Sequence, residues 1–174
     1  MIEITSTSTR KSIMMLSLSE IGHWEYSYRF DPEQWFGFVY CIENTATKQF
    51  YIGKKQFYHH GKKKSKTYGK EMSWRTYVGS STHVKKDIKK YGKDAFKFDI
   101  VDLYKTKGGM YYAEAYLQML CDCMTETLPN SDIPRFYNRQ IAAIRFVPKE
   151  HPTKRTRSFI NKIRKRYNGT NSNP

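Results

Sequence analysis

The chain has 174 residues, a length typical of one domain with short additions. Its 31 Lys and Arg residues exceed the 16 Asp and Glu residues, giving a formal net charge of +15. Hydrophobic residues make up 39% of the chain, enough for a core, which excludes a chain disordered throughout. No apolar run approaches the about 18 residues of a membrane span, and three cysteines are too few for a disulfide framework. We therefore expect a basic cytoplasmic protein without a secretory leader, a membrane partner or a small-molecule cofactor.

The basic residues gather in two places instead of being spread evenly. Six lysines lie between Lys54 and Lys66, and nine basic residues lie between Arg145 and Arg166. Clusters of this kind neutralise phosphates, so they predict a nucleic-acid partner. The predicted DNA contacts are Lys54, Lys62, Lys63, Lys64, Arg155, Arg157, Lys162, Arg164, Lys165 and Arg166.

Residues 1–34 are interpreted as an accessory segment, in which aromatic residues alternate with polar ones from 24 to 30, as in a half-buried strand. Two β-rich runs, 38–42 and 49–52, then predict a hairpin. With residues 44–47 as the loop, Glu43 faces Lys48 and Tyr40 faces Tyr51. The two tyrosines are then expected side by side on one face of the sheet.

Further elements follow from spacing and from stop signals. Ser80 or Ser81 is suited to cap a short helix that ends at Gly92. The other predicted elements are a strand over 95–104, a helix over 110–124, a strand over 141–147 and a basic amphipathic helix over 156–167.

Several short motifs occur in an order that resembles a known family. The stretch 38–40 ends in Tyr40, and Tyr51-Ile-Gly begins after ten intervening residues; a helix start near Ser80, a helix carrying Glu114 and the pair Tyr137-Asn138 follow. This order is similar to that of the GIY-YIG nucleases over about residues 37–145. The stretch 74–80, Trp-Arg-x-Tyr-x-Gly-Ser, is most similar to the free-standing, seg-type homing endonucleases of bacteriophages.

The resemblance implies an α/β (α+β) fold, with a small three-stranded antiparallel sheet flanked by helices. We divide the chain into an N-terminal segment (1–34), a nuclease domain (35–145) and a basic DNA-binding tail (146–174). The implied activity is hydrolysis of phosphodiester bonds in double-stranded DNA with Mg²⁺ or Mn²⁺. The recognised DNA sequence and the oligomeric state stay open.

The resemblance also implies roles for single residues. Glu114 would hold the metal, and Tyr40 would act as general base on the attacking water if Lys54 and Lys55 lower its pKa. Tyr51 would orient the water or the phosphate. From the residues alone, sheet packing for both tyrosines and a surface position for Glu114 are the favoured interpretations, and the order of the motifs reverses that preference.

Two further roles concern the cation for the phosphate, where the chain departs from the family, and an asparagine, where it matches the family. The family places an arginine soon after the second motif, but residues 54–74 contain none. Arg75 is the first available, and Lys55 is the alternative cation for the scissile phosphate. Asn138 is expected to hold backbone or a metal-bound water.

A different class of function also fits the composition. In a non-catalytic nucleic-acid-binding module, aromatic side chains stack on bases and lysines follow the phosphates. Tyr40 and Glu114 would then serve only the structure. A zinc site at Cys121 and Cys123 does not fit, because their spacing differs from that of paired zinc ligands and both fall on the predicted helix.

Overall fold

The computed structural model describes residues 18–168, and it contains one three-stranded antiparallel sheet in the order β2-β1-β3. The strands are β1 (Gly37–Asn44), β2 (Gln49–Gln56) and β3 (Phe96–Tyr104). The helices are α1 (Thr82–Tyr91), α2 (Lys107–Leu120) and α3 (Lys154–Asn168), and the short 3-10 helices are η1 (Leu18–Ile21), η2 (Pro32–Gln34) and η3 (Lys93–Ala95). The predicted α+β fold with a small antiparallel sheet is confirmed.

Local signals in the sequence explain where two of the helices begin and end. The Ser81 side chain accepts a hydrogen bond from the backbone N–H of Val84, and Gly92, with a φ of 81°, ends α1 as predicted. Thr106 caps α2 in the same way through the N–H of Gly109. Helix α2 ends at Leu120, earlier than the predicted residue 124, because the chain turns through a left-handed residue at Asp122.

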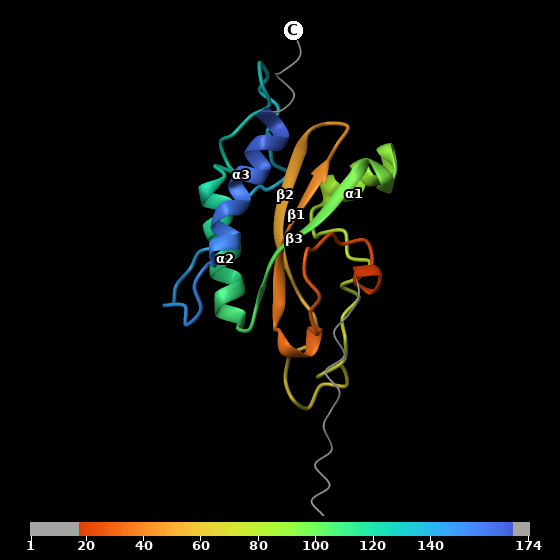
Figure 1. Cartoon of the computed structure of the whole chain (residues 1–174), viewed down its shortest axis with the longest axis vertical. Helices are drawn as coiled ribbons and strands as arrows, with labels where there is room; N and C mark the ends of the chain where they lie inside the picture. The colour runs from red at the N-terminus through yellow and green to blue at the C-terminus, as the bar shows by residue number, and fades with distance from the viewer. Residues whose placement is uncertain (1–17, 169–174) are drawn as a thin grey trace, which may run out of the picture.

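The sheet separates two apolar layers (Figure 1). Helices α2 and α3 cover one face, where Val39, Cys41 and Val101 of the sheet meet Leu117 and Ile163 of the helices. The N-terminal segment, the connection between β2 and α1, and α1 itself cover the other face; the buried residues there include Trp24, Trp74 and Val84. Both layers use the alternation of side chains along a strand.

The hairpin register differs by two residues from the predicted one. Tyr40 pairs with Gly53, and Ile42 pairs with Tyr51. The turn takes residues 45–48, because the Asn44 side chain accepts hydrogen bonds from two turn N–H groups and Lys48 adopts a left-handed φ of 61°. Since the shift is an even number, every side chain keeps its predicted face. Tyr40 and Tyr51 are diagonal neighbours, with ring centroids 6.1 Å apart.

Both outer strands of the sheet have backbone partners. On the β3 side, the Glu25 N–H donates to Phe98 and the Glu25 carbonyl accepts from Ile100. The N-terminal segment pairs here through an isolated bridge and not as the regular strand suggested by its alternation; its residues 1–17 lie outside the described part. On the β2 side, Phe50 exchanges backbone hydrogen bonds with Arg135 and Tyr137.

Two C-terminal predictions have different outcomes. The helix predicted over 156–167 is confirmed as α3, and its Phe159, Ile160 and Ile163 pack in the core, whereas the Tyr167 side chain lies outside the described residues. The strand predicted over 141–147 is wrong: this stretch is extended but pairs with no strand. Within residues 18–168, no helix is long and apolar enough to cross a bilayer.

Candidate active site

A cleft of about 210 Å³ opens along β2, an outer strand of the sheet. Because side chains alternate along a strand, Tyr51 and Lys55 of β2 belong to one face and Lys54 to the other. The cleft therefore brings together groups from both apolar layers. Its lining residues are Tyr40, Tyr51, Gly53, Lys54, Lys55, Gln56, Ser80, Met110, Tyr111 and Glu114.

Tyr40 enters the cleft by passing over Gly53. The Tyr40 side chain is 1% exposed, and its partner across the ladder is Gly53. A β-carbon at position 53 would lie 2.3 Å from the phenolic oxygen, so only glycine leaves room for the hydroxyl. Position 53 in the second motif must therefore be glycine, because the Tyr40 side chain of the first motif occupies the space that a β-carbon would need.

The hydroxyl groups beside Tyr40 form a short chain towards solvent. Tyr51 and Tyr77 are neighbours of Tyr40, each with its ring centroid 6.1 Å from that of Tyr40, and both affect its pKa. Tyr51 shares a hydrogen bond of 2.8 Å with the hydroxyl of Ser80, which is exposed. This arrangement connects a buried phenol to the surface through two oxygen atoms.

The lysines do not lower the pKa of Tyr40, contrary to the expectation. Burial raises the pKa of Tyr40 well above its usual value, and the hydroxyls of Tyr51 and Tyr77 raise it further. The ammonium of Lys55 instead lies 4.2 Å from the ring centroid of Tyr77. Lys54 is held on the far side of the strand, so neither ammonium stabilises a Tyr40 phenolate.

Glu114 lies in the middle of α2 and is buried, with 7% of its surface exposed. Its carboxylate forms an ion pair with Lys54, whose ammonium also lies 4.1 Å from the ring centroid of Tyr111. Burial raises the pKa of Glu114, and the pairing with Lys54 opposes that rise. The surface position considered as an alternative for Glu114 is therefore wrong.

Two side-chain amides bind the backbone of β2 at Ile52: Asn138, from the segment that follows α2, and Gln118, from α2 itself. The Asn138 side chain accepts from the Ile52 N–H at 3.0 Å and donates to the Ile52 carbonyl at 2.8 Å. Gln118, one turn after Glu114, donates to the same carbonyl at 3.0 Å. Asn138 thus holds backbone, one of its two expected roles. Gln118 was missed by sequence reasoning, although its i+4 spacing from Glu114 places both on one side of the helix.

The two candidate cations for the phosphate are in different places. Lys55 lines the cleft, and partial burial lowers the pKa of its ammonium. Arg75 lies elsewhere: it pairs with Glu71, donates to the Glu20 carbonyl at 2.8 Å and stacks on Trp74. The structure does not bring Arg75 to the cleft, because the sharp turn after Trp74 directs it to the N-terminal segment.

A second recess of about 170 Å³ adjoins the cleft and shares Lys54 and Glu114 with it. Arg139 lines this recess, and its guanidinium donates to the carbonyls of Phe136 and Asn138. Sequence reasoning missed Arg139, whose only signal is a charge next to the Tyr137-Asn138 pair.

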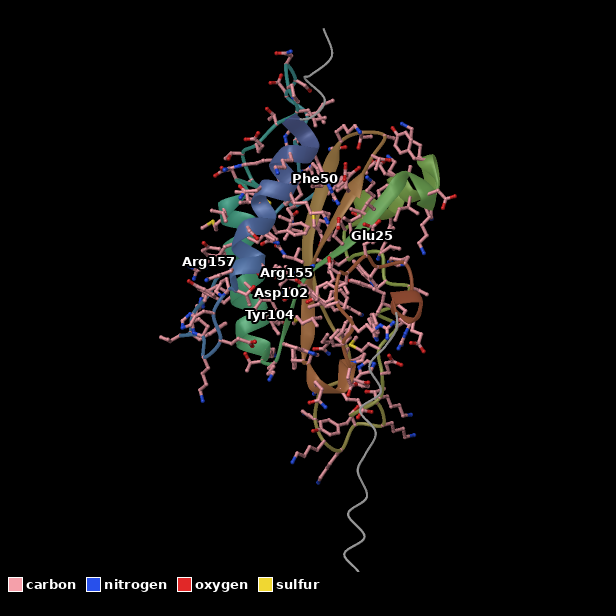
Figure 2. All side chains as sticks on the ribbon, in the orientation of Figure 1. Glu25, Phe50, Asp102, Tyr104, Arg155 and Arg157 are labelled. Atoms are coloured by element: carbon pink, nitrogen blue, oxygen red, sulfur yellow. The ribbon has the colours of Figure 1, made fainter. Side chains whose placement is uncertain are left out.

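The predicted DNA contacts divide into free and internally bound groups. Lys62, Lys63 and Lys64 are exposed on a loop whose base is closed by backbone hydrogen bonds of His59 with Gly69 and Lys70. Figure 2 shows Arg157 on the outer side of α3, which also exposes Arg164 and Lys165.

Other basic residues of α3 face the sheet. Arg155 donates to the Val101 carbonyl at 2.7 Å, and Lys162 pairs with the buried Asp99. Arg166 pairs with Asp99 at 2.6 Å and with Glu43 at 3.1 Å. These three side chains, like Lys54, have internal partners in the structure, which their prediction as DNA contacts did not anticipate.

The donor set at the cleft is limited to one carboxylate. Among residues 18–168, no group of three or more His, Cys, Asp or Glu side chains is arranged to hold a metal ion. A Mg²⁺ ion can be bound through one or two carboxylates when phosphate oxygens and water complete its shell. Glu114 fits such a site, in which the substrate supplies further ligands.

Comparison with known proteins defines the class to which this fold and cleft belong. Residues 23–141 match the family described as "Putative endonuclease segE, GIY-YIG domain". Because the match covers more than half of the chain, the chain belongs to this family of GIY-YIG endonucleases. The match begins at His23 and so includes Trp24, which packs in the core.

A curated phage protein is also similar. The chain is 28% identical over 129 residues to "Putative endonuclease segC" of Enterobacteria phage T4. The alignment covers 74% of this chain and 54% of the phage protein, so the chain spans about half the length of this relative. No solved structure was found to match.

Proposed function

We propose that the chain cuts double-stranded DNA by metal-dependent hydrolysis of phosphodiester bonds in the cleft along β2. The observation that carries this proposal is the meeting of Glu114, a buried carboxylate, with the hydroxyls of Tyr40 and Tyr51 in one cleft. Hydrolysis of a phosphodiester needs a site for the phosphate, a group that handles the proton of the attacking water and relief of negative charge. The cleft offers a group for each task. A homing-type role in the host cytoplasm belongs to the same proposal.

Glu114 is the residue that would hold Mg²⁺ or Mn²⁺. The ammonium of Lys54 contacts one carboxylate oxygen of Glu114, Oε2, and so holds the Glu114 side chain in place. This contact leaves the other carboxylate oxygen, Oε1, unconstrained. When bound, the ion supplies Lewis-acid stabilisation of the phosphate and of the leaving oxygen. Until the substrate arrives, the ammonium of Lys54 balances the negative charge of the buried Glu114 carboxylate.

Tyr40 would contact the attacking water. Since its pKa is raised, Tyr40 is a neutral phenol at pH 7 and orients the water by accepting a hydrogen bond. As its oxygen takes up a proton from the water, the hydroxyl proton of Tyr40 passes to Tyr51 and on through Ser80 to the solvent, so that Tyr40 stays neutral. Tyr51 therefore serves both the relay and the phosphate.

Lys55 would supply the positive charge that the family usually takes from arginine. Its ammonium lies in the cleft beside Tyr77, and its pKa is lowered by burial. A phosphate placed there would oppose this lowering of the pKa, because an adjacent anion favours the protonated form. Arg75, turned away towards Glu71, has no part in this proposal.

The exposed basic residues would hold the duplex on either side of the cleft. Three lysines on the 57–72 loop and three basic residues of α3 are free for phosphates. Contacts of this kind provide affinity that is independent of sequence and weakened by salt. They are Lys62, Lys63, Lys64, Arg157, Arg164 and Lys165.

The test is relaxation and linearisation of supercoiled plasmid with Mg²⁺ or Mn²⁺, with EDTA as the metal-free control. We expect the unaltered chain to cut and Glu114→Gln and Tyr40→Phe to cut about 10²–10⁴-fold more slowly. Glu33→Gln and Tyr91→Phe are matched controls at exposed positions and are expected to keep full activity.

The same plasmid separates this proposal from a non-catalytic nucleic-acid-binding module. If the unaltered chain retards the plasmid on a gel yet leaves it intact with both metals, the binding module is the better description. If Glu114→Gln cuts plasmid as fast as the unaltered chain, Glu114 is not the residue that binds the metal.

A further inference from the structure

Residues 139–149 form an extended segment along the outside of α2. At one end, Asn138 binds the Ile52 backbone; at the other, the Glu150 carboxylate accepts from the N–H and the hydroxyl of Thr106 at 2.9 Å. In between, Phe146 lies against Gly108 at the start of α2. Within residues 18–168, the backbone groups of 140–149 find no hydrogen-bond partner. The segment is thus held at its ends, with free donors and acceptors along its length.

An apolar groove of about 380 Å³ lies between this segment and α2. Its floor contains Tyr112 and Tyr116, whose rings are stacked with centroids 6.4 Å apart and an interplanar angle of 28°. Met119, which is 67% exposed, belongs to the same surface of the helix. The remaining lining residues are Ala115, Ile141, Ala142, Ala143 and Ile144.

The groove adjoins the candidate active site. Ala142 lines the groove and also the recess that contains Glu114 and Arg139. Because that recess shares Glu114 with the cleft, the cleft, the recess and the groove are successive neighbours, and the segment 139–144 borders the last two.

The charges around the groove are positive. The guanidinium carbon of Arg157 lies 6.0 Å from the ring centroid of Tyr116, and Arg145 is exposed on the segment itself. The groove lining contains no acidic side chain. A flat apolar floor with cations at its margin suits a planar ring attached to a phosphate backbone.

We propose that this groove binds an unpaired nucleobase of the DNA strand held in the cleft. The base stacks on Tyr112 and Tyr116, while Arg157 meets the adjoining phosphate. The free backbone groups of residues 140–144 contact the edge of the base and give the enzyme a preference among bases. The proposal rests on the proposed function, because it takes a DNA strand to be the occupant of the cleft.

The test compares two single-stranded probes with the full chain, in EDTA so that no cutting occurs. One probe is a fluorescein-labelled dT 12-mer, and the other has the same length and charge but abasic sites in place of the central bases. Fluorescence anisotropy gives the Kd for each. Ala143→Trp fills the groove from an exposed position, Tyr116→Ala removes half of the stack, and Tyr91→Ala on α1 is the matched control.

We expect the unaltered chain to bind the dT probe about 5- to 100-fold more tightly than the abasic probe, the range that one base–aromatic stack contributes. Ala143→Trp and Tyr116→Ala should abolish this ratio, and Tyr91→Ala should keep it. Thermal unfolding of each variant shows whether it is folded. In addition, 5-iodouracil in the probe should cross-link to Tyr112 or Tyr116 on irradiation.

Equal affinity for the two probes, or a ratio that survives in Ala143→Trp, would overturn the proposal. A dimer in sedimentation that Ala143→Trp dissociates, with strand binding unchanged, would assign the groove to contact between copies of the chain. Plasmid cutting separates the two proposals. If the chain cuts plasmid but binds both probes equally, only the proposed base site is wrong. If the chain binds the dT probe more tightly than the abasic probe and never cuts plasmid, the proposed nuclease function is wrong.

Discussion

The phenolic oxygen of Tyr40 lies against Gly53 of the neighbouring strand, where a β-carbon would approach it to 2.3 Å. The ring carbon bearing the hydroxyl would be 2.5 Å away, so rotation of the hydroxyl gives no relief. The tyrosine of one motif and the glycine of the other therefore form a single steric unit across the β1–β2 ladder.

Gly53→Ala is expected to cost about 1–3 kcal/mol of unfolding free energy, because the side chain of Tyr40 must be displaced from a packed position. Plasmid cutting should fall with it, since the displaced hydroxyl no longer reaches the cleft. Gly61→Ala is the matched control, because a β-carbon there would meet nothing within 4 Å. Urea denaturation of both variants measures the difference; equal stability would show that Tyr40 moves at no cost.

Asn138→Ala should cost about 1–3 kcal/mol, because the buried Ile52 N–H loses its side-chain partner and the Ile52 carbonyl keeps only Gln118. Hydrogen exchange gives a local readout: the Ile52 amide should exchange faster than in the unaltered chain, relative to amides of β3. Asn161→Ala, at an exposed position of α3, is the control. An unchanged Ile52 exchange rate would argue against the hydrogen bonds to Asn138.

Arg166→Ala should destabilise the fold by about 3–5 kcal/mol, because Asp99 loses one of its cationic partners and Glu43 is left buried beside it. Arg164→Ala, two residues earlier on the exposed side of α3, should change the stability little. Gel retardation of DNA should show the opposite order at a temperature where both variants are folded. Weaker DNA binding for Arg166→Ala than for Arg164→Ala under those conditions would contradict this assignment.

The unfolding free energy should decrease on acidification because of His23. Its Nε2 donates to the Tyr77 carbonyl at 3.1 Å, and burial together with Lys93 lowers the pKa of the ring from 6.5 to about 4. As the pH falls, His23 therefore becomes protonated at a higher pH in the unfolded chain than in the folded one. The contribution of His23 to the unfolding free energy is complete above pH 6.5 and is lost as the pH falls towards 4.

His23→Gln, which keeps a side-chain donor but does not titrate, should flatten the dependence of stability on pH between 4 and 6.5. Unfolding by urea at several pH values measures it. His83→Gln on the exposed side of α1 is the control and should leave the slope unchanged. The same slope in His23→Gln would place the titrating group elsewhere.

The parts of the fold that the sequence predicted depend on local signals. The Ser81 cap, the Gly92 stop and the alternation along β1 and β2 are each decided by a few neighbouring residues. The hairpin register was two residues off because the predicted Glu43–Lys48 pairing ignored the hydrogen bonds that Asn44 makes within the turn. An even shift preserves faces, which is why the prediction that Tyr40 and Tyr51 share a face survived.

The site was predictable as a set of residue types but not as a set of distances. The position of Arg75 depends on Glu71 and on the N-terminal segment, which are contacts made only in the folded chain. Lys54 was interpreted as a DNA contact because its attraction to Glu114, 60 residues away, leaves no local trace. The apolar run 141–147 resembles a strand, yet it lies along α2 because β2 is already occupied on that side by residues 135–138.

The partners along β2 and β3 bear on how this protein behaves when it is crowded. A three-stranded sheet has two outer strands, and unpaired outer strands invite pairing with another chain and growth into fibrils. Here residues 135–138 occupy the outer side of β2, and Glu25 occupies that of β3. Where many copies lie close together on a polyanion such as DNA, the stretches around Phe50, Ile52 and Phe98–Ile100 therefore offer no free backbone on which a neighbouring copy could add a strand.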